Sequence, residues 1–334
     1  MLPTASPFPA KPLGLPRFLR LTALSTGLLG LLASCSKDSE PVAAPAAPAR
    51  ISVPQPALSP EGIQWDEANK RFYVSSRTKG TVGAVRDDST YTEFGKDSRL
   101  ISTIGLNLDA GRQRLLAAVS DNGFNPSFVN QPTFRKLAAL AIFNSSTGAL
   151  TNFVDLGSLR PTGMHFANDI AVDKDGNAYI TDSMSPIIYK VDLQGTASVF
   201  LENAQLSGGT GFGMNGIVYH PDGYLLAAKT SDGTLFKVPI SNPAGFTTVT
   251  KTQSLVGADG LLLLDNTTLL VVAGSQSTVF RMSTADAWAT TAATGSFATG
   301  AVSPTTITKR GSDAYVLYPY NATAPRFRIV KATF

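Results

Sequence analysis

The sequence has few of the side chains that build soft-metal and redox sites. Its 334 residues include one cysteine and two histidines. A single cysteine excludes a disulfide within the chain and any zinc or iron–sulfur site built from several thiolates. Two histidines limit imidazole-rich sites in the same way. A metal site in this chain would therefore be built mainly from oxygen ligands.

Charged side chains are also scarce. They make up 16% of the residues, against 43% hydrophobic ones, which argues against a coiled coil or a disordered chain. The net charge of +4 invites a nucleic-acid interpretation, but Lys11, Arg17 and Arg20 precede residue 34 in a segment without acids. Without these three, 25 basic residues stand against 24 acidic ones. We therefore expect no nucleic-acid partner.

The apolar run near the N-terminus is too short to cross a membrane. Residues 21–32 form a run of 12, whereas a membrane span needs about 20. Behind several basic residues, such a run is typical of a signal-peptide core. It ends in Leu32-Ala33-Ser34-Cys35, which resembles a bacterial lipobox, in which the cysteine is lipidated and becomes the new N-terminus. An ordinary secretory signal with an accidental cysteine is the alternative.

The lipobox resemblance divides the chain into three parts. Residues 1–34 would be a lipoprotein signal peptide, and residues 35–49 would be lipidated Cys35 with a Pro/Ala-rich tether, which cannot form a packed core. Residues 50–334 would form the folded domain. We expect a monomer in the cell envelope, held to the outer membrane by its lipid anchor alone and either periplasmic or surface-exposed.

One pattern recurs after residue 50 at intervals of about 45 residues. A turn leads into a short apolar strand, a polar or glycine turn, and a second apolar strand. The six copies start at Glu61, Ile104, Asn168, Asn215, Asp259 and Thr305. Further runs rich in β-branched and aromatic residues follow each copy. The repeat predicts an all-β, six-bladed β-propeller with four antiparallel strands per blade; a pair of β-sandwiches or a β-helix is the alternative.

The last blade shows only three clear strands before the chain ends. We expect residues 50–53 to supply the fourth strand and close the ring, which would remove open sheet edges.

The second repeat is longer than the others, with 64 residues between its start and the next. The excess fits residues 121–135, between the second and third strands of that blade, so it would emerge on the face where the inner strands begin. It carries Phe124, Phe128 and Phe134. It would form either a partial lid with an apolar wall or a surface loop packed on its own blade.

The first residues of the blades predict a metal site. In a propeller the innermost strands line the central channel, so their starts converge on one mouth. Four of the six starts carry a carboxylate or amide oxygen, and these four are named the oxygen ring: Glu61, Asn168, Asn215 and Asp259. Such a set suits calcium, which takes six to eight hard oxygen ligands. Without a cation, the two carboxylates would push one another toward protonation. The alternative is that Asn and Asp merely begin strands as turn residues.

The motifs around these residues resemble a known family. They are Ser59-Pro60-Glu61-Gly62, Phe166-Ala167-Asn168-Asp169, Met214-Asn215-Gly216 and Ala258-Asp259-Gly260. They are similar to the gluconolactonase/regucalcin (senescence marker protein) family and its calcium-dependent phosphotriesterase-like relatives. The resemblance implies a six-bladed propeller whose channel mouth holds a divalent cation, usually Ca²⁺, on the oxygen ring.

The resemblance also implies hydrolysis of a lactone, ester or phosphotriester, in which the cation polarises the reacting oxygen. Asp259 would activate water or attack directly, and Glu61 would balance charge. Ile104 stands where sugar lactonases carry an amide, which favours a more hydrophobic substrate. The alternative is a non-catalytic, envelope-anchored propeller that binds a ligand or a protein partner, with calcium purely structural.

Three further residues remain open from the sequence. His165 precedes Asn168 in the loop to the mouth, so it is a candidate for proton transfer beside Asp259, or simply a solvated loop residue. His220 lies five residues beyond Asn215, roughly 17 Å along a strand, and should be a turn residue on the opposite face. Asp169 could bind a second ion or cap a turn.

Overall fold

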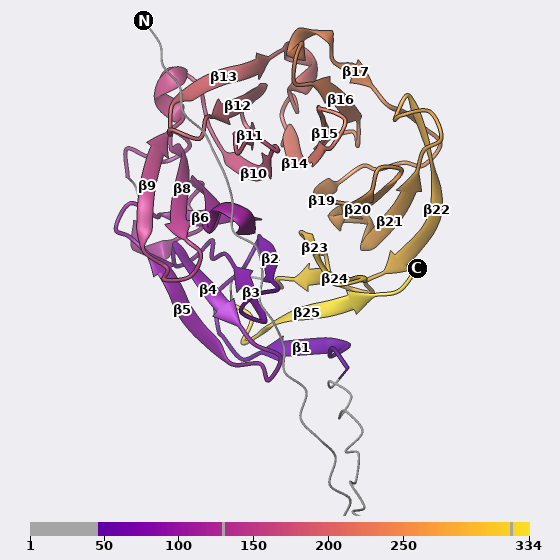
Figure 1. Ribbon diagram of the computed structural model, residues 1–334. Helices are drawn as coiled ribbons and strands as arrows, with labels where there is room; N and C mark the ends of the chain where they lie inside the picture. The colour runs from indigo at the N-terminus through magenta and orange to yellow at the C-terminus, as the bar shows by residue number, and fades with distance from the viewer. Residues whose placement is uncertain (1–45, 129–130, 321–322) are drawn as a thin grey trace, which may run out of the picture. The chain divides into compact units, whose positions relative to one another are not determined.

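The computed structural model describes residues 46–128, 131–320 and 323–334, and its strands form the six blades of a β-propeller (Figure 1). The predicted signal peptide, Cys35 and the tether up to residue 45 lie outside the described residues. Residues Ala47–Phe334 make one compact unit. Within the described part of the chain, no helix is long and apolar enough to cross a membrane.

The strands follow one another from the centre of each blade to its rim. Blade one comprises β2 Ile63–Asp66, β3 Arg71–Val74, β4 Thr81–Val85 and β5 Tyr91–Lys96. Blade two comprises β6 Ser102–Asp109, β7 Arg114–Ser120, β8 Ala138–Asn144 and β9 Leu150–Asp155. Blade three comprises β10 Ala167–Val172, β11 Ala178–Asp182, β12 Ile187–Val191 and β13 Ala197–Glu202. Blade four comprises β14 Met214–His220, β15 Tyr224–Lys229, β16 Leu235–Pro239 and β17 Thr247–Thr248.

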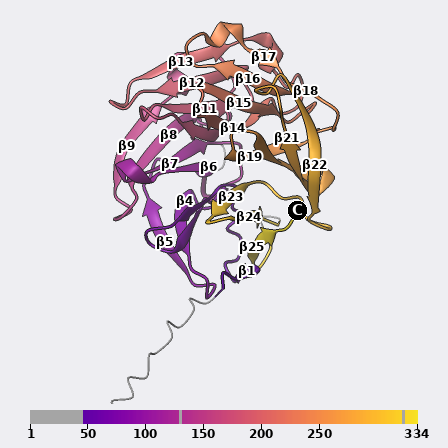
Figure 2. The same cartoon turned by 45° about the vertical axis from the view of Figure 1, so that its right-hand side comes forward.

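The last two blades each differ from this plan. Blade five comprises β19 Ala258–Asp265, β20 Thr268–Ala273, β21 Thr278–Ser283 and β22 Thr290–Ala298, and the two-residue strand β18 Thr250–Lys251 adds to it in parallel beside β22 (Figure 2). Blade six comprises β23 Ile307–Arg310, β24 Asp313–Tyr318, β25 Phe327–Ala332 and the N-terminal strand β1 Arg50–Val53. Among the described residues, six short 3₁₀ helices lie between strands: η1 Ala110–Arg112, η2 Pro126–Phe128, η3 Gly157–Leu159, η4 Ala204–Leu206, η5 Pro243–Gly245 and η6 Gly274–Gln276.

Burial on both faces explains why the second strands read as continuous apolar runs. Every residue of β20 is buried, and so is every residue of β7 after Arg114. A strand covered on both faces has no need of a polar side, so it does not alternate. The rim strands are solvated, and β9 exposes three of its six residues.

The hydrophobic core is divided into six clusters, each lying between two neighbouring blades. The cluster between blades six and one contains Ile51 and Val53 of β1 together with Phe72 and Tyr315. Strand β1 pairs antiparallel with β25 from Arg50 to Val53. The predicted ring closure by residues 50–53 is confirmed.

The long segment in blade two is also where the repeat spacing places it. It runs from the end of β7 to the start of β8 and contains η2. Asn125 Nδ2 donates to the Ile101 carbonyl at 2.6 Å, which ties the segment to the start of β6.

Candidate metal centre at the channel mouth

The four residues of the oxygen ring line a single cavity of about 300 Å³, named the mouth cavity. They come from four different blades and from positions up to 198 residues apart in the sequence. The remaining lining residues are Arg77, Phe124, Phe166, Phe212, Thr230, Ser303, Thr305, Pro319 and Tyr320. The convergence expected from the repeat is therefore present in the fold.

β-bulges aim three of the four side chains. The pairing of the first two strands shifts register in blades three, four and five, between Ala167 and Ile170, Met214 and Ile217, and Ala258 and Leu261. Each shift inserts an extra residue, which bends the strand and re-aims the side chains within it. Asn168, Asn215 and Asp259 each lie inside one of these bulges.

The inner strands approach one another closely around the ring. A Cβ on Gly216 would lie 2.1 Å from the Asp259 carbonyl oxygen, and one on Gly62 would lie 2.5 Å from the Ile104 carbonyl oxygen. Glycine after the first residue of a blade therefore lets neighbouring blades close around the mouth. Blade three has Asp169 at this position instead.

Hydroxyl groups behind the ring fix the orientation of both amides. Ser183 Oγ donates to the Met214 carbonyl at 2.6 Å, so it can only accept from Asn168 Nδ2, 2.8 Å away. Thr230 Oγ1 donates to the Ala258 carbonyl at 2.8 Å and accepts from Asn215 Nδ2 at 3.1 Å. The Nδ2 groups are thereby turned toward the blades. Each Oδ1 is left available to a ligand.

The two carboxylates of the ring are buried, and their ionised forms are disfavoured. Arg77 Nη1 lies 3.2 Å from Glu61 Oε2, yet this buried oxygen accepts no hydrogen bond from any described residue. Burial raises the pKa of Glu61 against the opposing charge of Arg77. Burial, together with the charges of Glu61 and Asp169, raises the pKa of Asp259 well above its usual value. The mutual repulsion expected of the two carboxylates is present, and a divalent cation would relieve it.

The donor set fits a hard divalent cation. Nowhere in the described part of the chain do three His, Cys, Asp or Glu side chains gather in a metal-binding group, so a site here has to combine carboxylates with amides. The ring offers two of each, with an unsatisfied Glu61 oxygen and oriented amides. These oxygens are ligands that calcium accepts and that zinc or copper sites seldom use.

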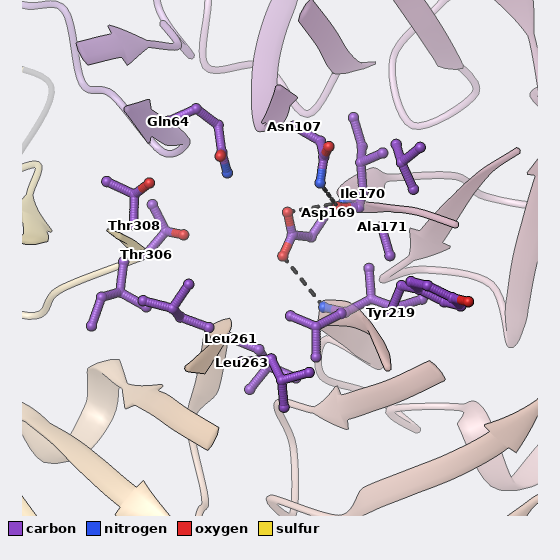
Figure 3. Close-up of a pocket in the computed structure, with 15 residues that line it drawn as sticks. Gln64, Asn107, Asp169, Ile170, Ala171, Tyr219, Leu261, Leu263, Thr306 and Thr308 are labelled. Carbon is purple, nitrogen blue, oxygen red and sulfur yellow. Dashed lines mark hydrogen bonds between the residues drawn. The ribbon is translucent and has the colours of Figure 1, made fainter. Parts of the chain in front are cut away.

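Asp169 points into the central channel behind the ring (Figure 3). This second cavity, of about 240 Å³, is also lined by Gln64, Asn107, Thr306 and Thr308. The Asp169 carboxylate accepts hydrogen bonds from the Ile170 and Ile217 backbone amides at 2.9 and 3.3 Å. Burial outweighs these bonds and raises the pKa of Asp169 to about 7. Asp169 therefore caps its own bulge and links blade three to blade four.

An aromatic row forms one wall of the mouth cavity. The ring centroids of Phe124 and Phe166 are 6.4 Å apart, and those of Phe166 and Phe212 are 5.5 Å apart. Arg77 lies over the Phe124 ring at 4.9 Å. Phe124 comes from the insertion of blade two, so this part of the predicted apolar wall is present.

The base of the insertion is held by bonds of its own. Arg135 N donates to the Asp121 carbonyl at 2.8 Å, and Thr133 Oγ1 donates to the Asp121 carboxylate at 2.8 Å. Phe134 is 47% exposed and stacks against Arg135. One phenylalanine of the insertion therefore faces the cavity, while its base is closed by its own hydrogen bonds.

The structure does not bring His165 into the mouth cavity. His165 is 1% exposed, with Nδ1 2.8 Å from Asp182 Oδ2 and Nε2 2.8 Å from the Arg160 carbonyl. Burial alone would lower the pKa of His165, but these hydrogen bonds outweigh it and raise that pKa. With both ring nitrogens facing acceptors, the proton-transfer role predicted for His165 has no support in the geometry.

His220 lies at the far end of β14 from Asn215, as expected. It ends that strand in a buried position, 1% exposed, with its Nε2 2.9 Å from the Asn266 carbonyl.

Sequence reasoning missed four polar residues of the mouth cavity: Arg77, Thr230, Ser303 and Tyr320. The Tyr320 hydroxyl is buried and has no hydrogen-bond partner among the described residues. Arg77 and Tyr320 follow β3 and β24, the second strands of their blades. Second strands run back toward the mouth, so the same strand count that found the ring could have located both.

A family model described as the SMP-30/Gluconolactonase/LRE-like region matches residues 59–316. No curated protein sequence matches the chain. Similar solved structures include the major allergen Mala s 1 of Malassezia sympodialis, with a TM-score of 0.69 and 19% identity over 86% of this chain and 97% of that one. A gluconolactonase from Xanthomonas campestris has a TM-score of 0.59 and 16% identity over 84% of this chain and 88% of that one.

A calcium-binding regucalcin from Agrobacterium tumefaciens has a TM-score of 0.59 and 15% identity over 85% of this chain and 94% of that one. At such identities these structures support the propeller fold alone. The family model, in contrast, spans all four residues of the oxygen ring. The chain therefore belongs to the SMP-30/gluconolactonase/LRE-like family.

Proposed function

We propose that the protein is a divalent-cation-dependent hydrolase of a lactone, ester or phosphotriester, with calcium as the cation. The observation that carries this proposal is the oxygen ring, in which four residues from four blades line one cavity in a member of this family. A bound cation would supply Lewis acidity, polarising the carbonyl or phosphoryl oxygen of the substrate. Every other part of the chemistry falls to side chains of the cavity.

Asp259 is the residue we assign to proton transfer. Burial and neighbouring carboxylates raise its pKa in the cation-free site, and a bound cation would keep the carboxylate ionised and able to accept a proton. It would accept a proton from the attacking water, or attack directly as a nucleophile. Glu61 balances the cation charge, and the neutral amides of Asn168 and Asn215 add ligands without further negative charge.

Two donors are available to bind the polar part of a substrate. Arg77 keeps its side chain at the cavity between Glu61 and Phe124, and the Tyr320 hydroxyl has no other partner among the described residues. An unpaired buried hydroxyl is costly unless a ligand or water completes it. We therefore assign both residues to substrate positioning.

The apolar wall argues for a hydrophobic substrate. Phe124, Phe166 and Phe212 cover one side of the cavity, and Ile104, at the start of blade two, is fully buried and brings no polar group to it. A free sugar-acid lactone would leave its hydroxyl groups against this wall without partners, which disfavours binding.

The test is a panel of lactones, carboxylic esters and phosphotriesters assayed with calcium and with EDTA. We expect turnover of at least one class, loss of that turnover in EDTA, and loss in Asp259→Asn. The matched control is Asp265→Asn, an exposed aspartate at the other end of the same strand β19, which should retain activity. A complete panel without cation-dependent turnover would contradict the proposal.

A non-catalytic role is the second candidate, and the Arg77–Glu61 ion pair favours it. Arg77 already balances part of the negative charge of the ring, so a catalytic cation is less necessary there. In that case calcium would only stabilise the propeller and the cavity would bind a ligand or partner. Asp259→Asn would then lower the melting temperature in calcium without removing any activity from the panel.

We also propose that the protein is a lipoprotein of the outer membrane, on the basis of Leu32-Ala33-Ser34-Cys35. Metabolic labelling with a fatty acid should modify the full chain and not the Cys35→Ser variant. Labelling of both, or of neither, would refute the anchor.

A further inference from the structure

A third cavity, distinct from the channel cavity around Asp169, lies beside the mouth cavity and is named the side cavity. It has a volume of about 270 Å³. Its lining residues are Asn122, Arg135, Met164, Met184, Gly209, Thr210, Gly211 and Phe212. Phe212 also lines the mouth cavity, so one aromatic side chain is the shared wall of the two spaces.

Three large apolar side chains lie among the lining residues of the side cavity. Met164 is 53% exposed and Phe212 is 39% exposed, and both are among the few large hydrophobic residues that the described part of the chain leaves open to solvent. Met184 is the third large apolar side chain of the lining. Grouped exposed apolar side chains in a concave site mark binding surfaces more often than chance exposure.

The side cavity is held by a rigid buried network. Asp182 Oδ1 accepts the Met184 amide at 2.9 Å, and Asp182 Oδ2 contacts the His165 ring at 2.8 Å. The His165 amide in turn donates to the Arg135 carbonyl at 3.0 Å. The Asp182–His165 pair therefore fixes three segments that line the side cavity, those that carry Met184, Met164 and Arg135.

A further bond completes the scaffold. Ser185 Oγ donates to the Met164 carbonyl at 2.6 Å, which joins the Met184 segment directly to the Met164 segment. A cavity whose walls are cross-linked in this way is formed before a ligand arrives, which lowers the ordering cost of binding. His165 is thus a positioning residue of the side cavity.

Arg135 sets the charge that the side cavity accepts. It brings a guanidinium to the lining, held by the Asn122 side chain at 3.0 Å and stacked on Phe134. This charge would repel a cationic substituent at close range, whereas it would not repel a neutral one and would attract an anionic one.

We infer that the side cavity binds the alkyl or aryl tail of the substrate, neutral or anionic at its end, while the reacting carbonyl lies in the mouth cavity. This inference rests on the proposed function and names its substrate class. Phe212 contacts both parts of such a molecule. Specificity among lactones that fit the mouth cavity would then depend on the tail.

The test uses γ-lactones that differ only in the length of the alkyl chain on the ring. For the wild-type protein with calcium, kcat/KM should rise by about two- to fourfold for each methylene that the side cavity covers. Met164→Asp should lower the ratio of kcat/KM for the long lactone over the short one by about tenfold, because it places a charge in the apolar wall. Leu193→Asp is the matched control: Leu193 is 45% exposed, remote from both cavities, and should leave the ratio unchanged.

A ratio that does not depend on chain length, or that falls equally in both variants, overturns the inference. Binding of 2-alkylcyclopentanones, measured by calorimetry, separates this failure from failure of the proposed function, since ketones are not hydrolysed. Affinity that rises with chain length and falls in Met164→Asp supports the side cavity even where no lactone is turned over. Affinity independent of chain length overturns it even where lactones are hydrolysed.

Discussion

At the scale of single residues, the oxygen ring depends on the hydroxyl groups behind it. Ser120, Ser183 and Thr230 each follow or end the second strand of a blade and donate to a backbone carbonyl of the next blade. Ser183 and Thr230 also accept from an amide of the ring. The same bond that joins two blades therefore decides which atom of the amide faces the cavity.

Removing the hydroxyl of Ser183 should weaken cation binding more than it weakens the fold. In Ser183→Ala the Asn168 amide loses the acceptor that orients it, and losses of this kind cost metal sites about 10- to 100-fold in affinity. Calorimetric titration with calcium measures the change. Ser120→Ala is the control, because Ser120 makes the equivalent bond to the Ala167 carbonyl without orienting an amide. Equal losses in the two variants would show that blade contact, and not amide orientation, matters.

The raised carboxyl pKa values predict how stability depends on pH. The folded protein holds a proton on Asp169 up to about pH 7, whereas the unfolded chain releases it near pH 3.8. The resulting stability is complete below pH 3.8 and is lost as the pH rises through 7. Burial also raises the pKa of Glu61, and burial together with the charges of Glu61 and Asp169 raises that of Asp259. In EDTA, the melting temperature should therefore fall by several degrees between pH 5 and pH 8.

Calcium should reverse this trend, because binding requires the carboxylates of the ring to be ionised and becomes tighter as the pH rises. Asp169→Asn removes one titrating group and should flatten the curve in EDTA. The raised pKa of His165 also makes stability fall as the pH rises. The comparison of wild type with Asp169→Asn therefore isolates the contribution of the Asp169 carboxyl. A melting temperature in EDTA that rises toward pH 8 contradicts the argument.

The ring and the Phe124 part of the apolar wall were predicted from the sequence, whereas the polar side chains around the ring were not. Glu61 and Asp259 open strands at equivalent positions of the repeat, so counting repeats brings them together. Arg77 and Tyr320 have no such signal in their residue types. His165 was misread because proximity in sequence to Asn168 says nothing about the direction of a side chain, which here is set by buried Asp182.

At the scale of elements, the start of each inner strand is the feature that makes the site. In blade four, for example, the bulge turns the Asn215 side chain toward the cavity, and Gly216, the next residue, allows blade five to approach. The two requirements fall on neighbouring positions, which explains the Asn-Gly and Asp-Gly pairs of blades four and five.

Adding one methyl group at Gly216 should damage both the fold and the site. A Cβ there would lie 2.1 Å from the Asp259 carbonyl oxygen, so Gly216→Ala has to push blade five away and should destabilise the protein by about 1–3 kcal/mol. Thermal unfolding and calcium titration check this. Gly111→Ala is the control, because a Cβ on Gly111 meets nothing within 4 Å. Unchanged calcium affinity in a destabilised Gly216→Ala would separate the close approach from the site.

The sequence predicted the elements better in the centre of the blades than at their rims. Runs such as Leu269 to Ala273 are buried on both faces, so their composition alone identifies a strand. The rim of blade four is reduced to the two residues of β17, and the chain then crosses to blade five as β18. The sequence does not show this division between two blades, because a solvated edge places little demand on residue type.

At the scale of the whole propeller, stability is shared among six equivalent interfaces, and one of them is closed by the two ends of the domain. The seam between blades six and one contains a cluster built from β1, β3 and β24. Five interfaces are continuous in sequence. The sixth is completed by the pairing of β1 with β25, so four residues at the start of the domain close the ring.

Truncation at the seam tests this dependence. A chain that begins at Ala47 keeps β1 and should unfold at the temperature of the longer chain. A chain that begins at Pro54 loses Ile51 and Val53, which are 1% and 0% exposed, and their burial alone is worth about 3–6 kcal/mol. It also leaves β25 as an unpaired edge, which promotes association between molecules. We expect a much lower melting temperature and concentration-dependent aggregation in the shorter chain only.

The same truncation should weaken calcium binding. Glu61 follows the seam directly, and its carbonyl accepts a hydrogen bond from the Thr305 hydroxyl across the seam. Full calcium affinity after loss of β1 would mean that the site is held by the five remaining interfaces alone.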